Sequence, residues 1–120
     1  MEQDEFSERL AKVRKRFAGK LATRIRDTGV ALPTLVGDDA AVSEAVAVTH
    51  RCIHELCGIG ATVGFDATGQ AARTMERVLL AATRSNRGLT AEEVTTLQSG
   101  LVALRNAALA DSASHGLALE

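Results

Sequence analysis

His54 is the residue in this 120-residue sequence whose surroundings most favour chemistry. A helix turns about 100° per residue, so the apolar residues of the segment 42–63 can be placed on one side of a helix. His54 falls roughly 140° from the centre of that side. Solvent-facing helix positions usually carry long charged side chains, but here the residues one turn on are Gly58 and Ala61. The sequence predicts an exposed imidazole that another molecule can approach. The apolar side consists of Val42, Ala45, Val46, Thr49, Cys52, Ile53, Leu56, Gly60 and Val63.

A neutral imidazole is a good nucleophile near pH 7, because one ring nitrogen keeps a free lone pair. In-line attack on a phosphoryl group also needs open space around that nitrogen. Gly58 leaves this space, although glycine inside a helix costs about 1 kcal/mol relative to alanine. Gly60 and Ala61 are expected to extend the clearing. The local loss of helix stability indicates a functional requirement.

Other residues of this segment are expected to surround His54 or to contact a partner that approaches it. His50, one turn before His54, is expected to line a docking surface, and it or Arg51 would supply positive charge near a phosphoryl group. Cys57 is placed at the edge of the exposed face and Cys52 toward the core. Phe65 is expected both to cap the end of the core and to contact a partner.

The same residues leave a metal site open as an alternative. His50 and His54 are four residues apart on one helix, and Cys57 lies near the same side, which is a spacing that zinc or copper can use. Against this, no further carboxylate or histidine within the helix completes a four-ligand set. We expect no metal site and no cofactor bound by this chain.

Composition predicts a single all-α domain that spans residues 1–120. Hydrophobic residues make up 46% of the chain and aromatic residues only 2%, and there is one proline. The net charge of −1 gives no general attraction to nucleic acid. No apolar run approaches about 18 residues, so no membrane span is predicted. The first residues are acidic, which is unlike a signal peptide. Cys52 and Cys57 are poorly placed for a disulfide, so a reducing, cytoplasmic setting is the simplest interpretation.

Apolar periodicity predicts four helices packed as an antiparallel, up-down-up-down four-helix bundle. The first covers about 5–27 and has a basic opposite face made of Lys12, Arg14, Lys15, Arg16, Lys20, Arg24 and Arg26. An irregular segment with Thr28, Gly29, Pro33 and Gly37 follows. The second helix starts near Asp38–Asp39 and ends at about Val63, where Gly64 breaks the pattern.

Asp66 is the expected N-cap of the third helix, and Gly88 is the expected left-handed residue after it. Thr90 and Glu93 predict a capping box for the fourth helix, whose apolar stripe runs from Val94 to Ala108. The tail 112–120, which includes His115, is expected to fray and to have no role.

The order of residues around His54 resembles the signature of histidine-containing phosphotransfer (HPt) domains. The resemblance is carried by His54, Leu56, Gly58 and Gly60, then by Val63-Gly64-Phe65, and further on by Ala72-Arg73-Thr74-Met75-Glu76, where that family has a small residue, a hydrophobic residue and a carboxylate. It covers residues 50–76, and the four-helix arrangement extends it to almost the whole chain.

The resemblance implies a phosphorelay intermediate that is a phosphoryl carrier rather than an enzyme. His54 would accept a phosphoryl group from the aspartate of one response-regulator receiver domain, such as that of a hybrid histidine kinase, and pass it to another. Mg²⁺ would be held by the receiver. The chain itself is expected to be a monomer that binds neither nucleic acid nor membrane. If the basic face of the first helix lies next to His54, its positive charge would attract the acidic phosphorylation pocket of a receiver domain and steer association.

One position departs from the family pattern. Many members have lysine or another polar residue three positions after the histidine, whereas this sequence has Cys57. Stabilisation of the phosphoryl group by the bundle itself is therefore expected to be weak, which leaves its charge to Mg²⁺ and lysine of the partner. A separate alternative is an adaptor that docks receiver domains through the same surface without being phosphorylated.

Overall fold

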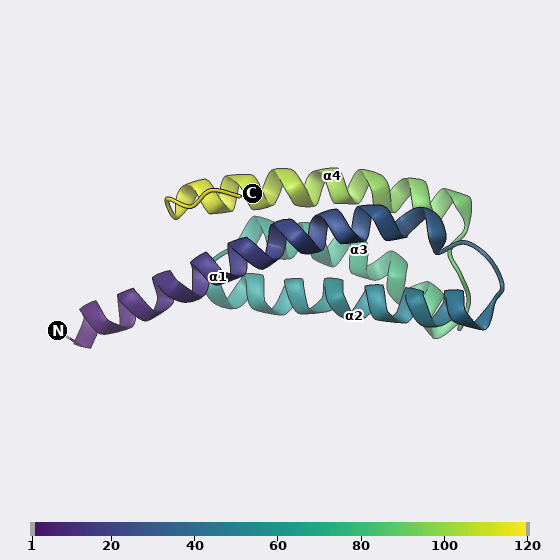
Figure 1. Cartoon of the computed structure of the whole chain (residues 1–120), viewed down its shortest axis with the longest axis horizontal. Coiled ribbons are helices and arrows are strands. Elements are labelled where there is room, and N and C mark those ends of the chain that lie inside the picture. Colours follow the sequence, from purple (N-terminus) through teal and green to yellow (C-terminus); the bar gives the residue numbers. More distant parts are fainter. Residues whose placement is uncertain (1, 120) are drawn as a thin grey trace.

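The computed structural model describes residues 2–119, with side chains from residue 4, and it is all-helical over this range. It contains α1 (Glu2–Ala31), a short 3₁₀ helix η1 (Leu32–Thr34), α2 (Ala40–Val63), α3 (Asp66–Arg84) and α4 (Ala91–Ser114). The four long helices lie side by side as a four-helix bundle, and the first turns of α1 extend beyond the others (Figure 1). The α1–α2 and α3–α4 loops lie at one end of the bundle and the α2–α3 turn lies at the other (Figure 1). The predicted all-α class is confirmed.

The core is built from aliphatic side chains of all four helices together with residues from the loops. Leu32 and Leu35 of the first connection, Phe65 of the second and Leu89 of the third are all buried. Phe17 and Phe65 pack edge to face in the core, with their ring centroids 5.1 Å apart. A core with so few aromatic residues allows the helix backbones to lie close together. Its largest fully buried side chains are Leu21, Leu32, Leu35, Val46, Ile53, Leu56, Phe65, Thr68, Met75, Leu79, Leu97 and Leu104.

Helix α1 is longer than the periodicity predicts, because it continues through Thr28 and Gly29 to Ala31. Thr28 is buried, and Gly29 faces α4 so closely that a Cβ there would lie 3.1 Å from Cδ2 of Leu101. This glycine therefore allows close helix packing and does not end the helix. The chain leaves the helix at η1, with Pro33 in its first turn, where a missing amide hydrogen costs little.

The predicted ends of α2 are confirmed. Asp39 is the N-cap, and its side chain accepts a hydrogen bond from the amide of Ala41 at 3.2 Å. Gly64 ends the helix in the left-handed conformation with φ 83°, which glycine adopts without steric cost.

The predicted cap of α3 is wrong by one residue. Phe65 is the N-cap residue and Asp66 is the first residue of the helix. Phe65 has no side-chain acceptor, so α4 supplies one: the amide and the hydroxyl of Thr68 both donate to Oδ2 of Asp111, at 2.7 and 2.8 Å. A carboxylate at a helix N-terminus also interacts favourably with the helix dipole. The cap of α3 thus comes from a residue 43 positions away in the sequence.

The α3–α4 loop also differs from the prediction in detail. Helix α3 ends at Arg84, and the left-handed residue is Asn86, with φ 50°, rather than Gly88. Gly88 is needed for a different reason: it packs against the backbone of Gly37 in the α1–α2 loop, and there is no room for a Cβ. The amide of Leu89 donates to the carbonyl of Leu35 at 2.8 Å and ties the two loops together.

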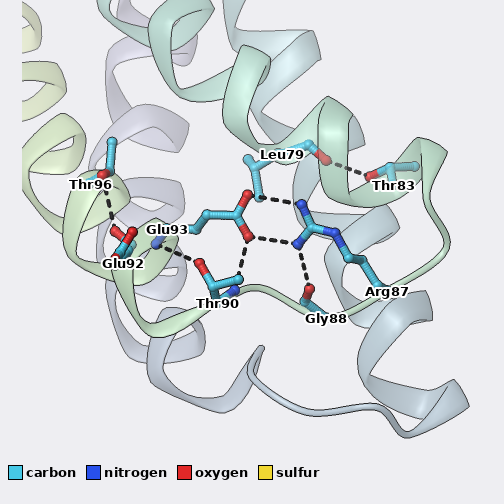
Figure 2. A network of polar contacts seen from close by, with 8 residues as sticks. All are labelled: Leu79, Thr83, Arg87, Gly88, Thr90, Glu92, Glu93 and Thr96. Atoms are coloured by element: carbon cyan, nitrogen blue, oxygen red, sulfur yellow. Dashed lines mark hydrogen bonds and ion pairs between the residues drawn. The ribbon is translucent and has the colours of Figure 1, made fainter.

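The predicted capping box at the start of α4 is confirmed and is extended by an arginine. Thr90 Oγ1 accepts from the amide of Glu93, and the Glu93 carboxylate accepts from the amide of Thr90. The guanidinium of Arg87 donates two further bonds to Glu93, at 2.7 and 3.1 Å, and one to the carbonyl of Gly88 (Figure 2). The hydrogen bonds from Arg87 lower the pKa of the Glu93 carboxyl group from 4.5 to about 2.

The C-terminal tail does not begin to fray where the sequence predicts. Helix α4 continues to Ser114, with Ser112 buried. The ring of His115 stacks on Phe65 at 5.4 Å, and its Nε2 lies 3.1 Å from the carbonyl oxygen of Gly64. Leu117 and Leu119 are partly buried against the core. His115 therefore covers the end of the bundle, contrary to the expectation that it has no role.

Replacing Glu93 by glutamine should lower the free energy of unfolding by about 1 kcal/mol at neutral pH, because the ion pair is lost while the amide still accepts from Thr90. The carboxyl group has a lower pKa in the folded protein than in the unfolded chain. Its contribution is therefore complete above about pH 4.5 and is lost as the pH falls through about 2. Urea unfolding of both proteins between pH 2 and pH 7 should show the two stabilities converging at the acidic end. A constant difference would contradict this assignment.

Candidate functional site

His54 lies at the middle of α2 with its side chain 70% exposed, as predicted. Its Nδ1 is in hydrogen-bonding contact with Oε2 of Glu76, a residue of α3 whose side chain is only 19% exposed. The carboxylate thus approaches the imidazole from the interior side of the helix pair. The side chain is otherwise mostly exposed, and Nε2 has no hydrogen-bond partner among the described residues.

The contact with Glu76 assigns the tautomer of His54. An ionised carboxylate can only accept, so Nδ1–H is the donor and the proton of the neutral ring resides there. Nε2 then carries the free lone pair. A carboxylate that holds one ring nitrogen in this way both orients the imidazole and stabilises the positive charge that develops on it when the other nitrogen reacts.

His50 faces the same carboxylate. It does not lie at the surface, contrary to the prediction that it lines a docking surface. Its side chain is 16% exposed, and its Nε2 is buried 3.7 Å from Oε2 of Glu76, without a hydrogen-bond partner among the described residues. The rings of His50 and His54 are stacked with their centroids 6.1 Å apart. His50 therefore fills the seam between α2 and α3 behind His54.

Two glycines bring α2 and α3 together one to two turns beyond the histidine. A Cβ on Gly60 would lie 3.2 Å from the carbonyl oxygen of Phe65 and 3.4 Å from the amide nitrogen of Gly69. A Cβ on Gly69 would lie 3.5 Å from the carbonyl oxygen of Cys57. The expectation that Gly60 clears space for a partner is therefore wrong. Gly60 is buried, and its role is to let the two backbones approach.

Gly58 behaves in the opposite way. It is exposed, and a Cβ built on it would meet no atom within 4 Å. Nothing inside the described molecule therefore requires glycine at this position. Ala61, one turn further, is exposed as well. The open space predicted beside His54 is present, and it is formed by Gly58 and Ala61.

Three of the remaining predicted positions differ from expectation. Cys57 is buried and Cys52 is half-buried, the reverse of the predicted arrangement. Burial raises the pKa of the Cys57 thiol, and the nearby charge of Glu76 raises it further, so the reactive thiolate is disfavoured. Phe65 is fully buried between Phe17 and His115 and cannot offer its ring to a partner. Arg51 is exposed on the same side of α2 as His54.

The basic face of α1 lies beside the exposed face of α2. Arg24 of α1 forms a 2.9 Å ion pair with Glu55, the residue that follows His54. Nearer the end of α2, a shallow apolar notch of about 150 Å³ lies between the helices, lined by Val13, Arg16, Phe17, Lys20 and Ile59. Ile59 is 41% exposed. The basic face of α1 therefore adjoins α2 along the side that carries Glu55 and Ile59.

Two absences within the described residues bear on the alternatives. No group of three or more His, Cys, Asp or Glu side chains between residues 4 and 119 is arranged to hold a metal ion. None of the helices in the described range is both long and apolar enough to cross a membrane.

Comparison with known proteins adds no assignment. No protein-family model matches the chain, and no curated protein or solved structure matches it. The geometry of the site is therefore what indicates a function.

Glu76, the hydrogen-bond partner of His54, was not predicted from the sequence to be a site residue. It was noted only as the carboxylate of the motif that resembles the family, with no assigned role. Its spacing from Met75 and Leu79, both buried, places it at the edge of the buried side of α3. That signal indicates a half-buried carboxylate, but the facing residue depends on how α3 packs on α2.

The two glycines of α2 should respond oppositely to alanine. Gly58→Ala should raise the free energy of unfolding by about 1 kcal/mol, because alanine is the better helix former and its methyl group meets open space. Gly60→Ala should lower it by about 1–3 kcal/mol, because backbone atoms of Phe65 and Gly69 must move. Chemical denaturation of the two variants beside the natural protein measures both changes. A stabilised Gly60→Ala variant would show that the helices do not need this close approach.

Proposed function

We propose that this chain is a histidine phosphotransfer protein of a multistep phosphorelay, built as an up-down-up-down antiparallel bundle. The observation that supports the proposal best is the exposed His54 ring, with Nδ1 bound by Glu76 and Nε2 free beside Gly58. Its partners would be receiver domains of response regulators and of a hybrid histidine kinase. We expect the chain to act as a monomer.

The proposed reaction exchanges one bond for another. Nε2 of His54 donates its lone pair to the phosphorus of a receiver's aspartyl phosphate, an N–P bond forms, and the P–O bond to the aspartate breaks. The aspartate leaves as a carboxylate, and Mg²⁺ on the receiver neutralises the charge that develops on the transferring oxygens. The reverse reaction passes the group to a second receiver. No cofactor on this chain is required.

The contacts of His54 explain how the chain would contribute. During attack the imidazole gains positive charge, and the half-buried carboxylate of Glu76 stabilises it. Gly58 and Ala61 leave room for the receiver's loops to bring the phosphorus into line with Nε2. Arg16 and Lys20 of α1, which line the notch beside Ile59, carry positive charge that favours a partner with an acidic pocket, whereas Arg24 is already paired with Glu55.

The direct test is phosphorylation by a phosphorylated receiver domain in the presence of Mg²⁺. The protein should acquire phosphate that is labile in acid and stable in base, and His54→Gln should lose this label while keeping its helical content, since the side chain is exposed. His115→Gln, which changes a histidine at the end of the bundle, serves as the matched control and should keep it. Label that persists in His54→Gln would place the nucleophile elsewhere, with His50 the first residue to examine. Receiver binding without any label would support an adaptor instead.

A second prediction concerns Glu76. Glu76→Ala should slow phosphorylation by about 10- to 100-fold, because the imidazole loses both its orientation and its fixed tautomer. Glu76→Gln keeps an oxygen that can accept from Nδ1–H, so it should lose less activity than the alanine variant. Nitrogen NMR of the His54 ring reports the tautomer directly. An unchanged tautomer and an unchanged rate in Glu76→Ala would show that this contact is incidental.

A further inference from the structure

A phosphoryl group on His54 would introduce negative charge, and α2 carries an exposed cation, Arg51, only on the N-terminal side of that position; the residues that follow it toward the end of the helix offer none. Gly58 and Ala61 are neutral, and Cys57 is buried with its pKa raised by burial. Glu76 adds a negative charge in contact with the ring. Like charges repel, so a cation on the Gly58 side of the ring, which only another helix can supply, would stabilise the phosphorylated state.

Arg73 of α3 occupies the required position. It lies three residues before Glu76, one helical turn along α3, and it is exposed. The Arg73 side chain makes no ion pair or hydrogen bond with any other described residue. Its charge nevertheless reaches the neighbourhood of Cys57, where it opposes the rise in the pKa of the thiol.

The packing of α3 on α2 gives Arg73 its register. Gly69 contacts Cys57 and Ala61, whereas Glu76, two turns later on α3, contacts His54 and His50. Contacts therefore step backward along α2 as they step forward along α3. Arg73 lies between these two contacts, which places it beside the stretch of α2 that runs from His54 to Gly58.

The surface between Arg73 and His54 is unobstructed by the chain itself. A Cβ on Gly58 would meet no atom within 4 Å, and the Cys57 side chain is turned inward. A long guanidinium side chain on the neighbouring helix can therefore extend over this clearing. A guanidinium also presents two parallel N–H donors, which match two oxygens of a phosphoryl group.

We infer that Arg73 binds the phosphoryl oxygens when the group is on Nε2 of His54, and that this arginine on α3 takes the place of a cation on α2 at position 57. The inference rests on the proposed function. Arg73 makes the phosphorylated protein an electrostatically balanced state before any partner is bound. It also gives the clearing beside Gly58 a second purpose, because the space that admits a receiver admits the guanidinium as well.

The test uses phosphoramidate as a small donor, so that no receiver contributes a cation. Nε2 of His54 attacks phosphorus, the P–N bond of phosphoramidate breaks, and ammonia leaves. Phosphorus NMR follows the phosphohistidine in the whole chain and four variants: Arg73→Gln, Arg73→Lys, Arg51→Gln and Arg105→Gln. Arg105 lies in the groove between α1 and α4, away from the seam of α2 and α3, and is the charge-matched control. Thermal unfolding of each variant checks that the fold is kept.

Arg73→Gln should be phosphorylated about five- to tenfold more slowly than Arg105→Gln, as expected for the loss of a hydrogen bond between charged groups at a partly screened site. Arg73→Lys should recover part of the rate, and the rate for Arg73→Gln should depend less on salt than the rate for the natural protein.

Equal rates for Arg73→Gln and Arg105→Gln, with His54 labelled in the natural protein, would overturn the role of Arg73. A loss of rate confined to Arg51→Gln would overturn it as well. Absence of label on His54 in the natural protein, with phosphoramidate and with a phosphorylated receiver alike, would instead overturn the proposed function.

Discussion

The close approach of α2 and α3 at Gly60 and Gly69 is the constraint on which the site depends. A Cβ on Gly60 would lie only 3.2 Å from the carbonyl oxygen of Phe65, a main-chain atom that cannot rotate away, whereas a Cβ on Gly69 would be in ordinary contact with main-chain atoms of α2 at 3.5 Å. Two glycines inside helices each cost about 1 kcal/mol relative to alanine. That cost is offset by a helix pair close enough for a carboxylate on one helix to reach an imidazole on the other. Any larger residue at Gly60 would separate the two helices and weaken the contact between Glu76 and His54.

A single carboxylate oxygen distinguishes two histidines that are one turn apart. Oε2 of Glu76 faces both His50 and His54, but only His54 makes a hydrogen bond with it. Four residues correspond to about 400° of helical rotation, so His50 lies roughly 40° closer to the interhelical seam than His54. This small rotation buries one imidazole nitrogen and leaves the other ring exposed. The chemistry of the pair therefore follows from helix geometry and from the side on which α3 packs.

The exposed face of α2 lies between two sources of positive charge. On one side Arg24 and the basic residues of α1 reach the surface beside Glu55, and on the other Arg73 lies on α3. The net charge of the whole chain is only −1 and conceals this local arrangement. A partner with an acidic pocket would meet favourable charge on both flanks of His54. The neutral residues Gly58 and Ala61 leave the centre of the face open.

The helices and most of their ends could be predicted from the sequence, because periodicity and local capping depend on residues within a few positions of one another. The stripes of α2 to α4, the Asp39 cap, the end of α2 at Gly64 and the capping box of Thr90 are of this kind. The exposure of His54 was predictable for the same reason. Errors arose where the determining contact was distant: Gly29 lies within α1 and lets Leu101 of α4 pack closely, and α3 is capped by Asp111 rather than by Asp66.

The sequence alone determined an all-α chain with a solvent-facing imidazole and a small residue beside it, since both follow from the angular period of one helix. Only the tertiary structure decided which groups surround that imidazole. It placed Glu76 on Nδ1, turned Cys57 and Phe65 inward, and separated the glycine that admits a helix, Gly60, from the glycine that leaves open space, Gly58. The physical reason is that periodicity specifies the direction of a side chain from its own helix axis, whereas its neighbours depend on the register and distance of the next helix.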